Sequence, residues 1–240
     1  MIQNLPVGRQ GSKLEIQNLL DPMENVSPLI KYFIEQGVPL DTVILLLILP
    51  IVVTLIAFFR QVIGIKAFGI YTPAIVTFAF LAIPQLRYGV LIFCVVILVG
   101  MLLRFALKGL RILYLPRVAI TLSIIAFSIL ILLSVGGAMQ RTGLAAVSIF
   151  PILIMITIVE KFVAAQIEKG NRAAVILAIE TLIISLVGYY LASWPALIKG
   201  IVAFPWMILI TIPINIFLGK WDGLRLNEYI RFREVLKNLK

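Results

Sequence analysis

The stretch RFALKGLRILYLPR, residues 104–117, decides how the rest of the chain is arranged. Its cations Arg104, Lys108 and Arg111 are spaced i, i+4 and i+7, so a helix would carry all three on one face. Apolar residues fill most of the remaining positions, and Pro116 is expected to end the helix. Because long apolar runs flank this basic amphipathic stretch on both sides, it is predicted to form a helix that lies in the membrane interface.

The composition around this stretch is that of an integral membrane protein. Hydrophobic residues make up 62% of the 240 positions and charged residues only 13%, and the mean hydropathy is +1.11. Soluble domains are closer to half apolar and a quarter charged, and they need more polar residues to cover their surface. The expected fold class is therefore all-α, a polytopic bundle of membrane helices.

Seven apolar runs are long enough to cross the hydrocarbon, which takes about 20 residues per helix. They cover residues 42–59, 65–83, 88–107, 118–138, 144–163, 173–193 and 197–218. The linkers are short, which favours sequential antiparallel neighbours. The predicted organisation is one seven-helix transmembrane domain over residues 41–219, with the basic interfacial helix between its third and fourth helices.

Polar segments flank this domain at both ends. Residues 1–40 are expected to form a tail with one short interfacial helix, which Ser27 caps, Pro28 starts and Gly37 ends. Residues 220–240 are expected to form a basic amphipathic tail at the cytoplasmic surface.

The distribution of cations predicts the orientation. The side with the amino-terminal tail collects six of the 21 basic residues, and the other side collects fifteen, including Arg104, Lys108, Arg111 and Arg117. Because cytoplasmic loops carry the excess of Lys and Arg, the amino terminus is predicted outside and the carboxyl terminus inside. The net charge of +10 is then assigned to anionic lipid and topology and not to nucleic acid, since the cations lie between apolar runs.

The residue types exclude much catalytic chemistry. Histidine is absent and Cys94 is the only cysteine, so no His- or Cys-based metal site, catalytic triad or internal disulfide can be built. No catalytic residue, metal or cofactor is predicted, and the chain is not expected to be an enzyme.

Two acids lie within the apolar runs. Glu180 is near the middle of AAVILAIETLIISLVGYY, where a carboxylate must be neutral or paired across helices. It is either a site for a proton, ion or amine, or a hydrogen-bonded acid that fixes helix packing. Glu160 lies near the end of the fifth run, where a local salt-bridged turn with Lys161 is the favoured account.

Prolines also interrupt several runs. GIYTPAIVTFAF around Pro73 and VSIFPILIMITI around Pro151 resemble each other, and both prolines are candidate helix breaks. The predicted topology gives these two helices opposite directions, as an inverted repeat in a transporter requires. Chance similarity is the alternative. Gly188 and Ala192 form one small-xxx-small pair, the only indication of a homo-oligomer.

Four stretches together resemble a known family. They are GIYTPAIVTFAF (69–80), LLRFALKGLRILYLPRVAI (102–120), FPILIMITIVEKF (150–162) and LGKWDGLRLNEYIRFR (218–233). They resemble the bacterial seven-transmembrane domain that is usually fused to an inactive transglutaminase-like domain, over about residues 41–235. Residues 115–119 and 225–232 are the most specific parts. The first two stretches are more distantly similar to the small C-type membrane subunit of poly-gamma-glutamate synthases.

The resemblance implies a multi-pass protein of the bacterial cytoplasmic membrane that partners a cytosolic ATP-grasp glutamate-ligase-like enzyme. The 40 residues before the first run are too few for a transglutaminase-like domain, which puts in doubt any substrate-recruiting role of that domain. The leading hypothesis is a non-enzymatic subunit that anchors the ligase through residues 104–117 and the carboxyl tail, and that offers an exit route for an anionic peptide or polyglutamate product. The alternative is an independent secondary transporter that uses Glu180 and paired broken helices. Whether residues 104–117 bind lipid or a protein partner stays open, with lipid favoured.

Overall fold

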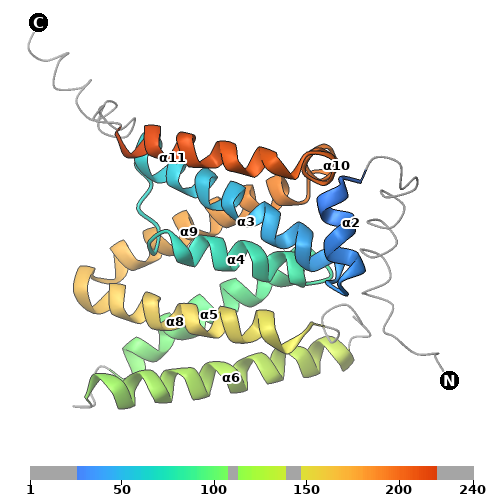
Figure 1. Ribbon diagram of the computed structural model, residues 1–240. Coiled ribbons are helices and arrows are strands. Elements are labelled where there is room, and N and C mark those ends of the chain that lie inside the picture. Colours follow the sequence, from blue (N-terminus) through green and yellow to red (C-terminus); the bar gives the residue numbers. More distant parts are fainter. Residues whose placement is uncertain (1–25, 108–112, 139–146, 221–240) are drawn as a thin grey trace, which may run out of the picture. The chain divides into compact units, whose positions relative to one another are not determined.

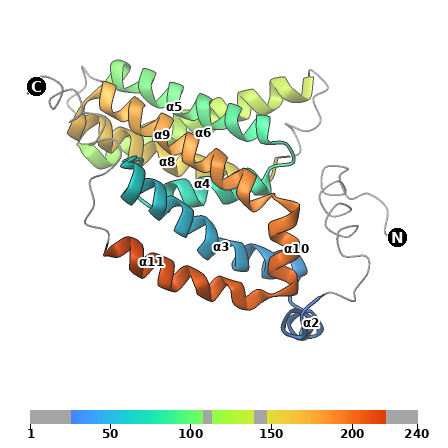
Figure 2. The ribbon, with the colours of Figure 1, turned by 90° about the horizontal axis from the view of Figure 1, so that it is seen from above.

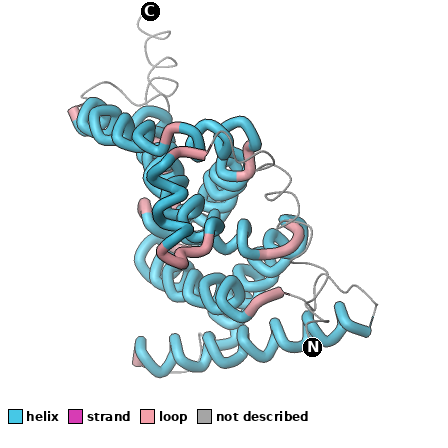
Figure 3. Tube along the Cα trace, turned by 45° about the vertical axis from the view of Figure 1, so that its right-hand side comes forward, coloured by secondary structure: helices cyan, strands magenta, loops and turns pink. Residues whose placement is uncertain are grey.

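The computed structural model describes residues 26–107, 113–138 and 147–220. Within these ranges every regular element is a helix and there is no strand (Figure 3). The elements in chain order (Figure 1) are α2 (Pro28–Glu35), α3 (Leu40–Phe58), the π-helix η2 (Phe59–Ile63), α4 (Tyr71–Ala82), α5 (Leu86–Leu107), α6 (Tyr114–Ala138), α8 (Ile149–Lys169), α9 (Asn171–Ala192), α10 (Pro195–Ala203), the 3-10 helix η3 (Pro205–Ile210) and α11 (Thr211–Gly219). The expected all-α class is confirmed.

The helices form two compact units. Among the described residues, unit 1 comprises residues 75–182 and unit 2 comprises residues 26–74 and 183–220. In unit 1, the helices α5, α6 and α8 pack against one another, and their core includes Ile92, Ile125 and Met155. In unit 2, α3 packs against α2, α10 and α11 (Figure 2). Helices α4 and α9 each have residues in both units. The boundaries predicted from the sequence, 1–40, 41–219 and 220–240, stay a prediction.

Five helices are long and apolar enough to cross a membrane. They cover Leu40–Ile63, Leu86–Ala106, Leu115–Ala138, Ile149–Lys169 and Asn171–Ala192. They correspond to the first and to the third through sixth of the expected spans. The chain is therefore a multi-pass membrane protein.

The second and seventh expected spans differ from the prediction. Helix α4 has only 12 residues, because Gly64, Ala67 and Gly69 all have positive φ and end helical geometry before it starts. The seventh run is bent by 104° between Pro195–Ala203 and Pro205–Gly219. Phe204 leaves helical geometry there with φ −131° and ψ 73°. The described residues therefore do not form seven straight spans.

Most of the prolines in the apolar runs begin helices and do not break them. Pro73, Pro116, Pro151 and Pro213 are each the third residue of a helix, namely α4, α6, α8 and α11. The first four N–H groups of a helix have no acceptor within it, so a missing N–H costs nothing there. Pro73 and Pro151, expected as helix breaks, do not interrupt the helices in which they lie.

The basic interfacial helix is not confirmed by the described residues. Arg104 lies in the last turn of α5, and Pro116 lies inside the first turn of α6, where it does not end a helix. Arg117 is the next residue of α6. Lys108 and Arg111 lie outside the described residues. The stretch is divided between two spanning helices because its apolar ends continue the flanking runs.

The short helix before the first span is confirmed. Ser27 has extended backbone, and its Oγ accepts a hydrogen bond from the N–H of Ile30 at 3.4 Å. Pro28 is the first residue of α2, which ends at Glu35, and Gly37 follows with φ +85°. The backbone N–H of Ser27 donates to the carbonyl of Val202 at 3.1 Å, which ties α2 to α10 within unit 2.

The absence of a side chain at Gly89 is predicted to allow the close packing of α5 on the end of α4. A Cβ at Gly89 would lie 2.7 Å from Phe80 Cδ1 and 3.2 Å from Ile83 Cδ1, whereas one at Gly137 would meet nothing within 4 Å. We expect Gly89→Ala to lower the free energy of unfolding by about 1–3 kcal/mol through overpacking. Gly137→Ala should leave it unchanged or raise it by up to ~1 kcal/mol. Unfolding by SDS in mixed micelles measures both, and equal values for the two variants would contradict the packing.

Candidate functional site

Hydroxyl side chains of the spans mainly bond to the backbone of their own helix. The donor and acceptor lie three or four residues apart in the pairs Thr72–Phe68, Thr121–Arg117, Ser123–Ala119, Ser128–Ile124, Thr157–Ile154, Thr181–Leu177 and Thr211–Ile208. Such bonds satisfy a polar group in an apolar environment without a partner helix. They are structural, and they carry no chemistry.

The hydroxyl of Ser185 bonds to another helix. Ser185 of α9 is 0% exposed, and its Oγ donates to the carbonyl of Pro73 of α4 at 3.0 Å, within unit 2. Sequence analysis missed this pair, because a serine in an apolar run gives no indication of its acceptor 112 residues away. Pro73, expected to break a helix, instead supplies the acceptor that joins α4 to α9.

A second polar contact joins α3 to α11 in unit 2. Asn215 Nδ2 donates at 2.7 Å both to Thr54 Oγ1 and to the carbonyl of Thr211. Thr54 Oγ1 itself donates to the carbonyl of Pro50 at 2.7 Å. Pro50 is the one described proline that lies well inside a helix. The contact therefore fixes α11 beside the point where α3 carries its proline.

Glu180 lies in the middle of α9 and is partly buried. It has an interaction partner in the structure. Both interpretations from the sequence, a binding site and a hydrogen-bonded packing residue, stay predictions. Glu160 is exposed on α8, which continues to Lys169 and therefore places this acid further from the helix end than the sequence indicated.

The pair Gly188 and Ala192, expected to mark a homo-oligomer, is buried within the chain itself. Ala192 is only 2% exposed. Small residues let helices approach closely, and the burial of this pair assigns it to packing within the chain. A homo-oligomer stays a prediction, and this buried pair does not supply its contact surface.

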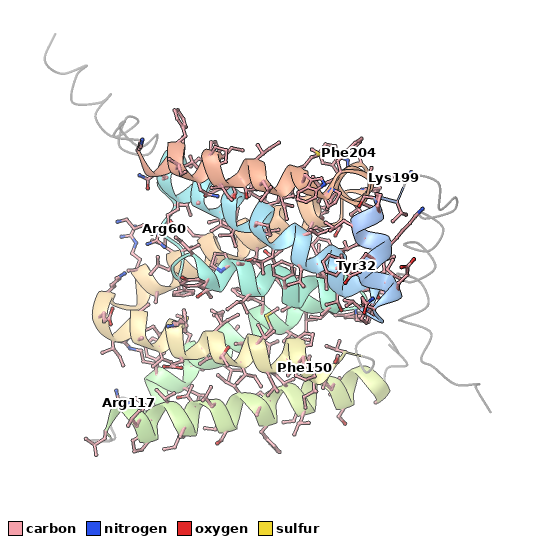
Figure 4. All side chains as sticks on the ribbon, in the orientation of Figure 1. Tyr32, Arg60, Arg117, Phe150, Lys199 and Phe204 are labelled. Atoms are coloured by element: carbon pink, nitrogen blue, oxygen red, sulfur yellow. The ribbon has the colours of Figure 1, made fainter. Side chains whose placement is uncertain are left out.

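Basic and amide side chains gather at one end of unit 1. Arg104 is in the last turn of α5, and Arg117 is in the first turn of α6, which returns from the same end (Figure 4). At this end α8 also finishes and α9 begins, with Gln166 in the last turn of α8 and Asn171 as the first residue of α9. Gln166 is 0% exposed. The sequence singled out the arginines but not the two amides.

No metal site is formed by the part of the chain that the structure describes. No group of three or more His, Cys, Asp or Glu residues lies close enough there to hold an ion. Cys94 is exposed on α5. The chemistry that the described residues offer is therefore hydrogen bonding and charge, supplied at the end of unit 1 and along α9.

These features define the class of protein as a polytopic helical membrane domain. Residues 16–236 match the profile of seven transmembrane helices usually fused to an inactive transglutaminase, and the chain belongs to that family. The resemblance seen in the sequence is thus confirmed. No curated protein matches the chain, and no solved structure matches it.

The hydrogen bond between Ser185 and Pro73 is expected to stabilise unit 2 measurably. Ser185→Ala removes a buried bond between helices, so the free energy of unfolding should fall by about 0.6–2 kcal/mol. Ser123→Ala is the matched control, because Ser123 is exposed and bonds only to its own helix. Its effect should stay within ~0.5 kcal/mol. Unfolding by SDS compares the variants, and a loss no larger than the control's would rule out a stabilising bond.

Proposed function

We propose that the chain is a non-enzymatic membrane subunit that anchors a cytosolic ATP-grasp glutamate-ligase-like enzyme. The non-enzymatic part of this role agrees with the family, whose description is of transmembrane helices usually fused to an inactive transglutaminase. The observation that carries the proposal is the placement of Arg104 and Arg117 at a single end of unit 1. In this role Lys108 and Arg111, which lie between them in sequence, and the basic tail 220–240 supply further positive charge.

The proposed orientation puts this basic surface in the cytoplasm of a bacterial cell, with the amino terminus outside the inner membrane. Fifteen of the 21 basic residues belong to the proposed cytoplasmic side, in line with the positive-inside rule. A basic cytoplasmic face also suits an anionic peptide or polyglutamate product, which it would attract to the membrane for export.

Binding of the ligase is tested by pull-down of an ATP-grasp ligase-like protein encoded beside this chain. Replacing Arg104, Lys108 and Arg111 by Gln is expected to reduce its capture about tenfold or more, because charge complementarity governs such docking. The matched control replaces the three cations of the opposite predicted face, Arg87, Arg141 and Lys199, by Gln and should retain capture.

Capture of the ligase from solubilised membranes by the unaltered chain decides whether the anchoring role is correct. If the unaltered chain captures no ligase, the anchoring role is wrong. If both triple variants lose capture equally, the basic surface is not the docking site.

A second candidate function is secondary transport, and Glu180 is the observation that favours it. An acid in the middle of a membrane helix is a common site for protons or ions. The paired broken helices expected at Pro73 and Pro151 no longer support this function, since both prolines begin helices. The bent pair α10 and α11 is the discontinuity that remains, and discontinuous helices are typical of transporters.

Transport is tested by proton- or ion-coupled flux in proteoliposomes. Glu180→Gln removes the ionisable group at nearly constant shape and should abolish coupled flux if Glu180 carries the ion. Glu160→Gln is the control, because Glu160 is exposed on α8. A flux that is the same in both variants and in the unaltered chain would remove Glu180 from any transport mechanism.

A further inference from the structure

Gln166 and Arg104 in unit 1 bury polar atoms that the described residues leave unsatisfied. Gln166 is 0% exposed, and neither its Nε2 nor its Oε1 has a hydrogen-bond partner among the described residues. The Nη1 atom of Arg104 is likewise buried without such a partner. Native proteins pair nearly all buried polar groups, so an amide and a guanidinium nitrogen that find no partner among the described residues point to a bound group that those residues do not supply.

Arg104 and Gln166 lie at the same level on facing sides of α5 and α8. The register follows from Gly100, where a Cβ would lie 3.4 Å from Val159 Cγ1 and 3.5 Å from Phe162 Cδ1. Arg104 is four residues beyond Gly100 and Gln166 four residues beyond Phe162, one helical turn in each case and on the same helix face. Helices α5 and α8 run in the same direction, and α6, which comes between them in the chain, runs in the opposite direction (Figure 1). Each side chain is thus one turn beyond a close contact of the two helices.

The start of α9 adds a third component at this end. Gly170 alone separates α8 from α9, and its carbonyl accepts the first bond of α9, from the N–H of Ala174 at 3.1 Å. Glycine has no side chain with which to cap the free N–H groups of the first turn, which carry a partial positive charge. Asn171 begins the helix, and its Oδ1 is another buried atom without a partner among the described residues. Arg172 follows and adds a full positive charge.

The unsatisfied atoms define the chemistry of the missing group. Arg104 Nη1, Gln166 Nε2 and the first N–H groups of α9 are donors and require an anionic acceptor. Gln166 Oε1 and Asn171 Oδ1 are acceptors and require a donor. A phosphate group that carries a hydroxyl or an ammonium group supplies both, as a phospholipid headgroup or hydrogen phosphate does.

The depth of the site agrees with this chemistry. Arg104 is two residues from the end of the candidate span Leu86–Ala106, which is the level of the membrane interface, where lipid phosphates lie. The first turn of α6, with Arg117, begins at the same end. The positive charge of the site is therefore presented to the phosphate layer.

We propose that Arg104, Gln166 and the first turn of α9 form a binding site for a phosphate group at the end of unit 1. The site needs neither a ligase partner nor transport by Glu180, so its test is independent of the proposed function. It explains why an amide is kept in a fully buried position where an apolar residue of the same size would otherwise pack better.

The first experiment uses the full chain without any substitution. The protein is delipidated in a neutral detergent, and its midpoint of thermal unfolding is measured with added phosphatidylglycerol or phosphatidylethanolamine, with a phosphate-free glycolipid, or with inorganic phosphate. Phosphate-bearing ligands should raise the midpoint by several degrees when present at about 100 times Kd, and the glycolipid should not. Stabilisation by the phospholipids alone identifies a lipid headgroup, and stabilisation by inorganic phosphate identifies a soluble phosphate. Equal effects of all lipids, with none from inorganic phosphate, would overturn the site.

The second experiment compares variants that keep the size of the side chain. Gln166→Met and Arg104→Gln should each weaken binding of the stabilising phosphate ligand about tenfold, the loss expected for one or two charge-assisted hydrogen bonds. Gln85→Met is the control, because Gln85 is exposed immediately before α5, at the opposite end of that helix from Arg104. The sign of the stability change is decisive. If nothing binds, Gln166→Met removes an unsatisfied buried amide and makes the protein more stable with unchanged phosphate binding, which would overturn the proposal. If phosphate binds, the variant loses ligand-dependent stabilisation.

Discussion

Backbone hydrogen bonding in hydrocarbon is the constraint on which the rest of this structure depends. No water is present in the bilayer core to satisfy a backbone group, so each spanning segment must bond within itself. Proline cannot donate, and it is therefore concentrated where a helix has spare donors, in the first turns of α4, α6, α8 and α11. A proline in an apolar run of this chain therefore usually lies at the start of a helix. Pro205 after Phe204 likewise lies at the bend between α10 and α11, whereas the positive φ of Gly64, Ala67 and Gly69 accounts for the short α4.

The same constraint governs the polar side chains. Most hydroxyls of the spans bond back to their own helix, which satisfies them wherever the helix packs. Helix contacts then depend on shape, as at Gly89 and Gly100, where the absence of a side chain lets a neighbouring phenylalanine come close. The bonds of Ser185 to Pro73 and of Asn215 to Thr54 add direction to that packing within unit 2. Gln166 stands apart, because its buried amide bonds to neither its own helix nor a described neighbour, and this is the observation behind the proposed phosphate site.

The assignment of the two ends of the basic stretch 104–117 to α5 and α6 changes its interpretation. As a single interfacial helix it would lie on the membrane and could detach from it. Divided between α5 and α6, it holds Arg104 and Arg117 at fixed levels on two packed spans. A charge held in this way is a permanent part of the interface, and it can combine with groups from α8 and α9. Anchoring of a partner and binding of phosphate are then compatible uses of the same end of unit 1.

Hydropathy, cation distribution and the four family stretches were sufficient to predict a membrane protein, its all-α class, five of its spans and its family. The cap formed by Ser27 and Pro28 was also predictable, because capping depends on adjacent residues. The division at Gly64–Gly69, the bend at Phe204 and the positions of the prolines within helices were not, since hydropathy reports only how apolar a run is and not its backbone angles. The neighbours of Gln166 and Ser185 could not be predicted from the sequence either. Both lie in apolar runs, and their surroundings depend on contacts between helices that are distant in the chain, which only the tertiary structure brings together.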